Sequence, residues 1–230
     1  MTVRARWWTL LAAAMATPAA IAHGGAEKAP APVAAPRFDF EPPAPGTYKL
    51  PVIKQAADGQ VLDSKGRALS LREALAGRIT LLSFIYTRCS DANGCPLATA
   101  VLHRIEQASR KNAALAANLR LVSLSFDPAH DTPEVMARYH NPASPEAAEW
   151  VDLTTASEAA LAPILAGYDV PVQKGVDATG QKDQVLGHQL RAYLIDREGR
   201  VRNIYGLDFL DPRLLAADVL TLLAEEQAAR

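Results

Sequence analysis

Two long apolar runs constrain the fold of this chain more than any other feature. Ile79–Tyr86 reads ITLLSFIY and Leu119–Phe126 reads LRLVSLSF. Both are rich in β-branched and aromatic residues, which is typical of central strands that are buried on both faces. Between them, Pro96 suits the first turn of a helix. The sequence therefore predicts a β-α-β unit at the centre of an α/β fold.

The flanking segments extend this pattern. Leu97, Val101, Ile105 and Ala108 keep helical spacing after Pro96, and Glu198-Gly199 predicts the turn of a β-hairpin. The other predicted elements are a strand at 60–63, a helix at 71–76 capped by Ser70, a helix beginning at 131–134, a strand at 150–153, a helix at 158–166 capped by Ser157, hairpin strands at 191–196 and 201–205, and a last helix from Asp211-Pro212 to about Glu226. This order is that of a thioredoxin-like fold: a central mixed β-sheet flanked by helices, here with an N-terminal extension.

The chain is expected to have three parts. Residues 1–22 read as a signal peptide, because Arg4 and Arg6 precede an apolar stretch and Ala20-Ile21-Ala22 fits a cleavage site. An uncleaved membrane anchor is the alternative, although the apolar stretch is short for a span of about 20 residues. Residues 23–46 are rich in Pro and Ala and predict a linker, and residues 47–230 form the folded domain. The expected location is therefore the periplasm.

Composition fits one domain and excludes a nucleic-acid surface. The chain has 230 residues, 49% of them apolar, which is enough to bury a core. Its formal net charge is −1, from 24 basic and 25 acidic residues. Basic residues do not gather in runs, so we expect no nucleic-acid partner.

Cys89 and Cys95 are the two cysteines of the chain. They could form one structural disulfide, but a loop this short would remove little entropy from the unfolded chain. Cys95 directly precedes Pro96, at the expected start of a helix, and Arg88 is a neighbouring cation. Both features predict lowered thiol pKa values. Redox or metal chemistry is therefore the favoured interpretation.

Three segments resemble the SCO/SenC family. The first is Phe84-Ile-Tyr-Thr-Arg-Cys89 followed by Cys95-Pro96. The second is the run from Val122 to Glu134. The third is Gly187-His188 ahead of Tyr193–Gly199. They occur in the family order and cover most of residues 47–230.

The resemblance implies a thioredoxin-like domain that binds copper through two cysteines and one histidine. The implied ligands are Cys89, Cys95 and His188, with Asp127 as an acidic residue close to the site. Members of the family serve as copper chaperones or thiol reductants in cytochrome oxidase assembly. This chain departs from the family pattern because five residues, not three, separate its cysteines. The extra residues either bulge out at Asn93-Gly94 or change the separation of the sulfurs.

The residue chemistry agrees with this implication. Two thiolates and an imidazole suit Cu(I), whereas Zn(II) usually takes a fourth ligand. His188 precedes a predicted strand, where thioredoxin-type reductases carry a cis-proline, and no Pro lies between Val185 and Asp196. A loop or core histidine with no metal role is the alternative for His188.

The other polar candidates have weaker support. His130 is either an exposed loop residue or a weak fourth ligand, His103 and His140 are expected on the surfaces of helices, and His23 could chelate Cu(II) at a processed N-terminus. Asp131 reads as a helix cap, and Asp127 could simply end its strand.

Four functional classes stay open. The leading one is a periplasmic copper-binding metallochaperone, expected to be a monomer, which delivers copper to a client copper protein such as an oxidase subunit. The second is an enzyme, a thiol-disulfide oxidoreductase that uses Cys89 and Cys95 as a redox pair on exported clients. A peroxiredoxin-like peroxidase is weaker, since Thr87 stands two residues before Cys89 and no Pro lies in Ile79–Arg88. A pure interaction module is the last.

Overall fold

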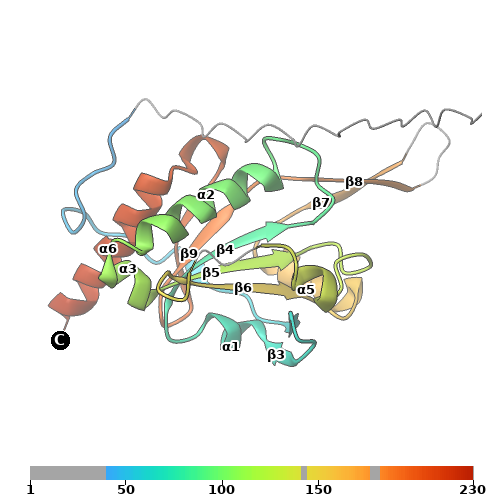
Figure 1. Cartoon of the computed structure of the whole chain (residues 1–230), viewed down its shortest axis with the longest axis horizontal. Coiled ribbons are helices and arrows are strands. Elements are labelled where there is room, and N and C mark those ends of the chain that lie inside the picture. Colours follow the sequence, from blue (N-terminus) through green and yellow to red (C-terminus); the bar gives the residue numbers. More distant parts are fainter. Residues whose placement is uncertain (1–39, 141–143, 177–181, 230) are drawn as a thin grey trace, which may run out of the picture. The chain divides into compact units, whose positions relative to one another are not determined.

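The two apolar runs form the centre of the sheet. Strands β4 (Ile79–Ile85) and β5 (Leu119–Ser125) pair in parallel, from Ile79 opposite Leu119 to Ile85 opposite Ser125. Helix α2 (Cys95–Ser109) lies between them in the chain (Figure 1). All residues of β4 are buried, as expected for a strand covered on both faces. The predicted β-α-β unit is confirmed.

The computed structural model describes residues 40–140, 144–176 and 182–229, with side chains left out for 173–176 and 182–188. The predicted signal peptide and most of the predicted linker lie outside these ranges. The described end of the linker packs on the last helix: Gly46 N donates to Thr221 Oγ1 over 3.0 Å, and Arg213 reaches Glu41 over 3.2 Å.

The main sheet is mixed, with eight strands in the order β1-β10-β9-β4-β5-β6-β2-β3. Its parallel strands are β4, β5 and β6, and β9 joins β4 antiparallel. A separate antiparallel pair, β7 and β8, has Val172 opposite His188. The remaining strands are β1 (Lys54–Gln55), β2 (Gln60–Asp63), β3 (Ala68–Ser70), β6 (Glu149–Thr154), β7 (Val172–Val176), β8 (Lys182–His188), β9 (Ala192–Ile195) and β10 (Arg200–Tyr205).

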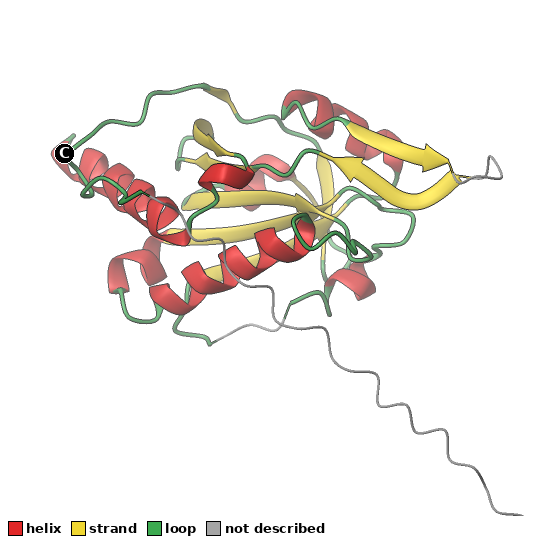
Figure 2. Ribbon diagram, turned by 90° about the horizontal axis from the view of Figure 1, so that it is seen from above, coloured by secondary structure: helices red, strands yellow, loops and turns green. Residues whose placement is uncertain are grey.

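Helices cover both faces of the sheet (Figure 2). Alternation along β4 sends Leu81 into one core with residues of α2, α3 and α6, and Leu82 into a second core with residues of α1 and α5. The helices are α1 (Leu71–Leu75), α3 (Ala113–Asn118), α4 (Pro133–Met136), α5 (Glu158–Gly167), α6 (Pro212–Ala228) and the 3-10 turn η1 (Leu207–Phe209). This arrangement confirms the predicted α/β class.

The predicted elements occur close to their expected bounds, and Ser70 and Ser157 cap their helices through side-chain hydrogen bonds. Of the residues with helical spacing on α2, Leu97, Val101 and Ile105 are buried, whereas Ala108 is exposed. Four short elements were not predicted, β1, β3, α3 and η1, because their local patterns are too short to distinguish them from loops. The β7-β8 pair was also missed, although its strands have five and seven residues.

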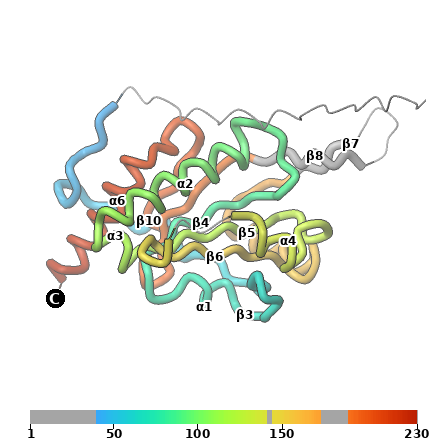
Figure 3. Tube along the Cα trace, in the orientation of Figure 1, coloured from blue at the N-terminus to red at the C-terminus, as the bar shows by residue number. Residues whose placement is uncertain are grey.

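Parallel pairing places the ends of β4 and β5 at one edge of the sheet. In the trace of Figure 3, the segment after β4 leads to the start of α2, and the segment after β5 leads to α4 at the same end. The segment after β4 carries both cysteines, and the segment after β5 carries Asp127, His130 and Asp131. The fold therefore brings these residues to one edge.

Candidate functional site

The two thiols meet between the end of β4 and the start of α2. Cys95 is the first residue of α2 and is 1% exposed, whereas Cys89 is partly exposed in the loop before it. Both cysteines are free thiols, and Cys89 packs against the same apolar core that contains Cys95. The fold therefore holds the two thiols close together, near enough for Cys89 to influence the pKa of Cys95.

A tight turn absorbs the extra residues between the cysteines. Gly94 N donates to Asp91 O over 2.9 Å, and Asn93 N donates to Asp91 Oδ1 over 3.0 Å. Ser90 to Asn93 are exposed, whereas Gly94 is buried. A Cβ added at Gly94 would lie 3.1 Å from Cys89 Sγ and 3.2 Å from Asp91 O. The glycine thus lets the turn close against the Cys89 sulfur.

The prediction of a lowered pKa is wrong for Cys95. Burial raises the pKa of the Cys95 thiol well above its usual range, and the adjacent Cys89 sulfur adds to the rise, although a backbone hydrogen bond with Tyr86 acts in the opposite direction. The partial positive charge at the helix N-terminus lowers a thiol pKa, but this effect does not outweigh that of burial. Cys95 is therefore a protonated thiol near neutral pH.

Arg88, the predicted cation beside Cys89, forms an ion pair with Asp127. Its Nη2 donates to Asp127 Oδ2 over 2.9 Å and lies 2.7 Å from His130 Nδ1. His130 Nδ1 is also 2.9 Å from Asp127 Oδ1. These three side chains form a polar cluster, and Arg88 is the sequence neighbour of Cys89. Asp127 is buried, and the His130 side chain is 48% exposed. A supporting role for Asp127 and His130 stays a prediction.

Asp131 does not cap α4, so that expectation is wrong. The N-cap of α4 is Thr132. The Asp131 carboxylate instead accepts hydrogen bonds from Thr87 N, over 3.0 Å, from Thr87 Oγ1 and from Ser125 Oγ. Asp131 is fully buried and ties the segment after β4 to the end of β5. Its partners are distant in the sequence, so no local signal could have identified them.

His188 is the last residue of β8, where its backbone pairs with Val172. The prediction placed it in a loop before a strand, so its strand was missed. Its side chain is outside the described part of the chain. Among the described side chains, no group of three or more His, Cys, Asp or Glu residues could hold a metal ion. The joining of His188 to the two thiols therefore stays a prediction.

His140 was expected on a helix surface, and this is wrong. It follows α4, its side chain is only 5% exposed, and its Nδ1 contacts Asp152 Oδ2. Its ring stacks on Trp150 with centroids 4.4 Å apart. His103 does lie on α2, with its side chain 34% exposed and Nδ1 3.1 Å from Glu106 Oε2. The partners of His140 come from β6, which explains why its burial escaped local pattern analysis.

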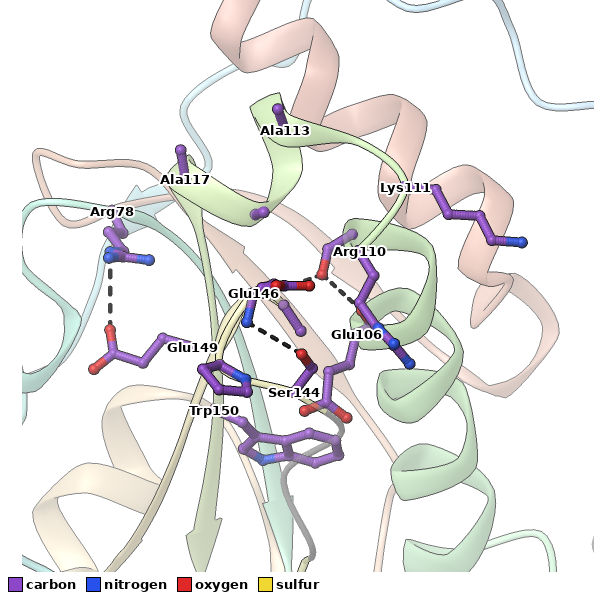
Figure 4. A pocket seen from close by; sticks show the side chains of 15 residues that line it. Arg78, Glu106, Arg110, Lys111, Ala113, Ala117, Ser144, Glu146, Glu149 and Trp150 are labelled. Carbon is purple, nitrogen blue, oxygen red and sulfur yellow. Dashed lines mark hydrogen bonds and ion pairs between the residues drawn. The ribbon is translucent and has the colours of Figure 1, made fainter.

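A pocket of about 830 Å³ lies at the other end of α2. Figure 4 shows its lining, including Glu106, Arg110, Lys111, Glu149 and Trp150. Arg78 pairs with Glu149 across its edge at 3.8 Å. Because α2 has 15 residues, the pocket is roughly 20 Å from the thiols along the helix. It is not part of the thiol site.

Comparisons with known proteins agree with this geometry. Residues 55–224 match the family model described as SCO1/SenC. A SCO1 protein homolog of Bacillus subtilis is 29% identical over 141 residues, which are 61% of this chain and 67% of that protein.

Two solved structures share the fold. One is Bradyrhizobium japonicum ScoI with copper bound, at 24% identity and a TM-score of 0.56, covering 75% of this chain and 98% of that chain. The other is BsSco, described as having a disulfide switch and as a member of the Sco family of cytochrome c oxidase assembly proteins. It has 24% identity and a TM-score of 0.59, covering 76% of this chain and 97% of that chain. The match to the family model spans most of the folded domain, and the chain belongs to the SCO1/SenC family.

Proposed function

We propose that this protein binds copper through Cys89, Cys95 and His188 and passes it to a client copper protein. The observation that carries the proposal is that two free thiols lie close together at the start of α2, with Cys89 packed against the core that contains Cys95. Thiolates are soft donors that suit Cu(I). Family membership and the copper-bound ScoI of Bradyrhizobium japonicum support the same assignment.

The exposure of the site suits transfer rather than storage. Cys89 is partly exposed, whereas Cys95 is buried behind it. A client ligand can therefore approach Cys89 first and exchange for it, while Cys95 holds the metal. Binding requires the Cys95 proton to leave, because the thiolate is the ligand. The client we propose is a respiratory oxidase subunit or a related copper enzyme.

The proposed location is the periplasm, after cleavage behind Ala22. The support is the sequence of residues 1–22, with its two arginines, apolar stretch and small-residue cleavage site. Within the described residues, the helices are too short or too polar to cross a membrane.

A competition titration tests the copper assignment. Reduced protein and a Cu(I) chelator of known affinity compete for the metal. Loss of a residue that only hydrogen-bonds to a metal ligand weakens metal binding roughly 10–100-fold. Cys89→Ser, Cys95→Ser and His188→Ala should each weaken copper binding by more than this. His103→Gln is the control, because His103 lies on α2 away from the thiols. Binding by all three ligand variants as tight as that of the unmodified protein contradicts the assignment.

The closeness of the two free thiols also supports a second function, thiol-disulfide exchange, and BsSco is described as having a disulfide switch. An oxidoreductase needs Cys89 and Cys95 but not His188. Insulin reduction separates the two functions. Full turnover by His188→Ala with no copper affinity would favour the enzyme, and slow or absent turnover by the unmodified protein would favour the chaperone.

A further inference from the structure

Tyr139 reaches the helical turn that carries Cys95. It follows α4 in the segment after β5, and its hydroxyl lies 2.6 Å from Thr99 Oγ1. Thr99 Oγ1 in turn donates to the backbone carbonyl of Cys95 over 2.9 Å. Cys95 and Thr99 are one helical turn apart on α2. A chain of two hydrogen bonds therefore links Tyr139 to the backbone of the buried cysteine.

The direction of these two hydrogen bonds follows from the number of hydroxyl hydrogens that are available. A threonine hydroxyl has one hydrogen, and Thr99 gives it to the Cys95 carbonyl. Thr99 Oγ1 can therefore only accept from Tyr139, which must be the donor. Burial raises the pKa of Tyr139 above its usual range, so the phenol keeps its proton near neutral pH. Hydrogen bonds in such a series polarise one another.

Tyr139 is anchored from the opposite side by the residue that follows it. The His140 ring stacks on Trp150 at an interplanar angle of 16°, and its Nδ1 contacts Asp152. Trp150 and Asp152 both belong to β6, and Trp150 Nε1 donates to Ser123 Oγ of β5 over 2.9 Å. The residue next to Tyr139 is thus anchored to the sheet, and the Tyr139 hydroxyl itself contacts Thr99 of α2.

We propose that Tyr139 is a positioning residue for Cys95, acting through Thr99 to fix the first turn of α2 and with it the buried sulfur. The proposal deepens the proposed function and rests on it, since it concerns the same pair of thiols. Loss of the phenol hydroxyl leaves Thr99 Oγ1 without its donor and frees the turn. The Cys95 sulfur then spends more time exposed and away from Cys89.

Competitive alkylation of the reduced protein tests this, with iodoacetamide at fixed pH and each cysteine quantified by mass spectrometry. Tyr139→Phe should raise the Cys95 rate relative to the Cys89 rate about fivefold, the factor expected for loss of one buried hydrogen bond. Thr99→Val should raise it at least as much, and Thr99→Ser, which keeps the hydroxyl, should leave it unchanged. In the Thr99→Val background, Tyr139→Phe should have no further effect.

Tyr205→Phe is the matched control. Tyr205 is more deeply buried than Tyr139, its hydroxyl lies 2.6 Å from Asp218, and it belongs to the core on the α6 side of the sheet. It should leave the ratio of the two rates unchanged. Equal effects of Tyr139→Phe and Tyr205→Phe, or additive effects of Tyr139→Phe and Thr99→Val, would overturn the proposal.

Copper titration of the same variants separates the two proposals. Coupled Tyr139 and Thr99 effects on alkylation in a protein that binds no copper would support the positioning role and contradict the copper function. Normal copper binding with an unchanged alkylation ratio in Tyr139→Phe would overturn the positioning role alone.

Discussion

Burial of Cys95 at the first position of α2 decides the protonation state of its thiol. The sulfur is shielded from water, so the neutral form is favoured and the pKa is raised. Formation of a thiolate there must accompany metal binding or disulfide exchange with Cys89. Cys95 is therefore a protonated thiol that loses its proton when it reacts, rather than a standing thiolate nucleophile.

This raised pKa predicts that the reduced protein loses stability in alkali. The folded state keeps the Cys95 proton at a pH where the unfolded chain, with a thiol pKa of about 8.5, has released it. The contribution is therefore complete below that pH and declines above it, by up to about 1 kcal/mol per pH unit. Urea unfolding of the reduced protein between pH 7 and pH 10 measures it. In Cys95→Ser the decline should be shallower, and equal slopes for the two proteins would contradict the burial argument.

Gly94 predicts a steric effect on the Cys89 sulfur. A Cβ at this position would lie 3.1 Å from Sγ, closer than ordinary packing allows, and the backbone φ of Gly94 is −97°. Gly94→Ala should therefore displace the sulfur and reduce the equilibrium constant for disulfide formation with glutathione severalfold, at a stability cost of about 1–3 kcal/mol.

Gly206→Ala is the control for this change. A Cβ at Gly206 meets nothing within 4 Å, and Gly206 also has negative φ, −85°. Disulfide formation should stay as in the unmodified protein. If Gly94→Ala behaves in the same way, the turn is able to relax and Gly94 does not set the position of the sulfur.

At the scale of elements, the site depends on the two segments that leave β4 and β5. Phe126 N donates to Ile85 O over 2.9 Å as the strands end. Beyond that point Asp131 holds the segments together through Thr87 and Ser125. The thiol loop is therefore supported by polar contacts from the neighbouring strand as well as by its own turn.

Asp131→Asn should weaken this support strongly. The Asp131 carboxylate now accepts hydrogen bonds from Thr87 and Ser125. The asparagine NH₂ group is itself a donor, so at least one of these buried donors would lose its partner, at a cost of about 1–3 kcal/mol. We expect a loss of unfolding free energy in that range or slightly above it, together with faster alkylation of Cys89. Asp208→Asn on the exposed η1 turn should change stability by less than about 0.5 kcal/mol. Similar small losses for both variants would contradict the role of Asp131.

The long elements could be predicted from the sequence because their signals are local. β4 and β5 are continuous apolar runs, and α5 begins at a serine that caps it. The positions of Cys89, Cys95 and Asp127 at one sheet edge followed from the strand order alone. The pKa of Cys95, the contacts of Asp131 and the burial of His140 depend on partners from other elements. Such partners are set by packing, which one-dimensional patterns do not specify.

For the whole molecule, the mixed sheet with helices on both faces brings the thiol loop to one of its edges (Figure 1). The pocket lies at the other end of α2. The family match over residues 55–224 covers most of this arrangement. The proposed function requires that one copper ion is bound by two sulfurs from that edge and by the imidazole of His188, about a hundred residues later in the chain.

X-ray absorption at the copper edge tests this claim most directly, on reduced full-length protein loaded with Cu(I). We predict two sulfur ligands and one nitrogen ligand in the unmodified protein, one sulfur fewer in Cys95→Ser, and loss of the nitrogen with both sulfurs kept in His188→Ala. A copper ion without sulfur ligands, or a nitrogen ligand that persists unchanged in His188→Ala, would contradict the account.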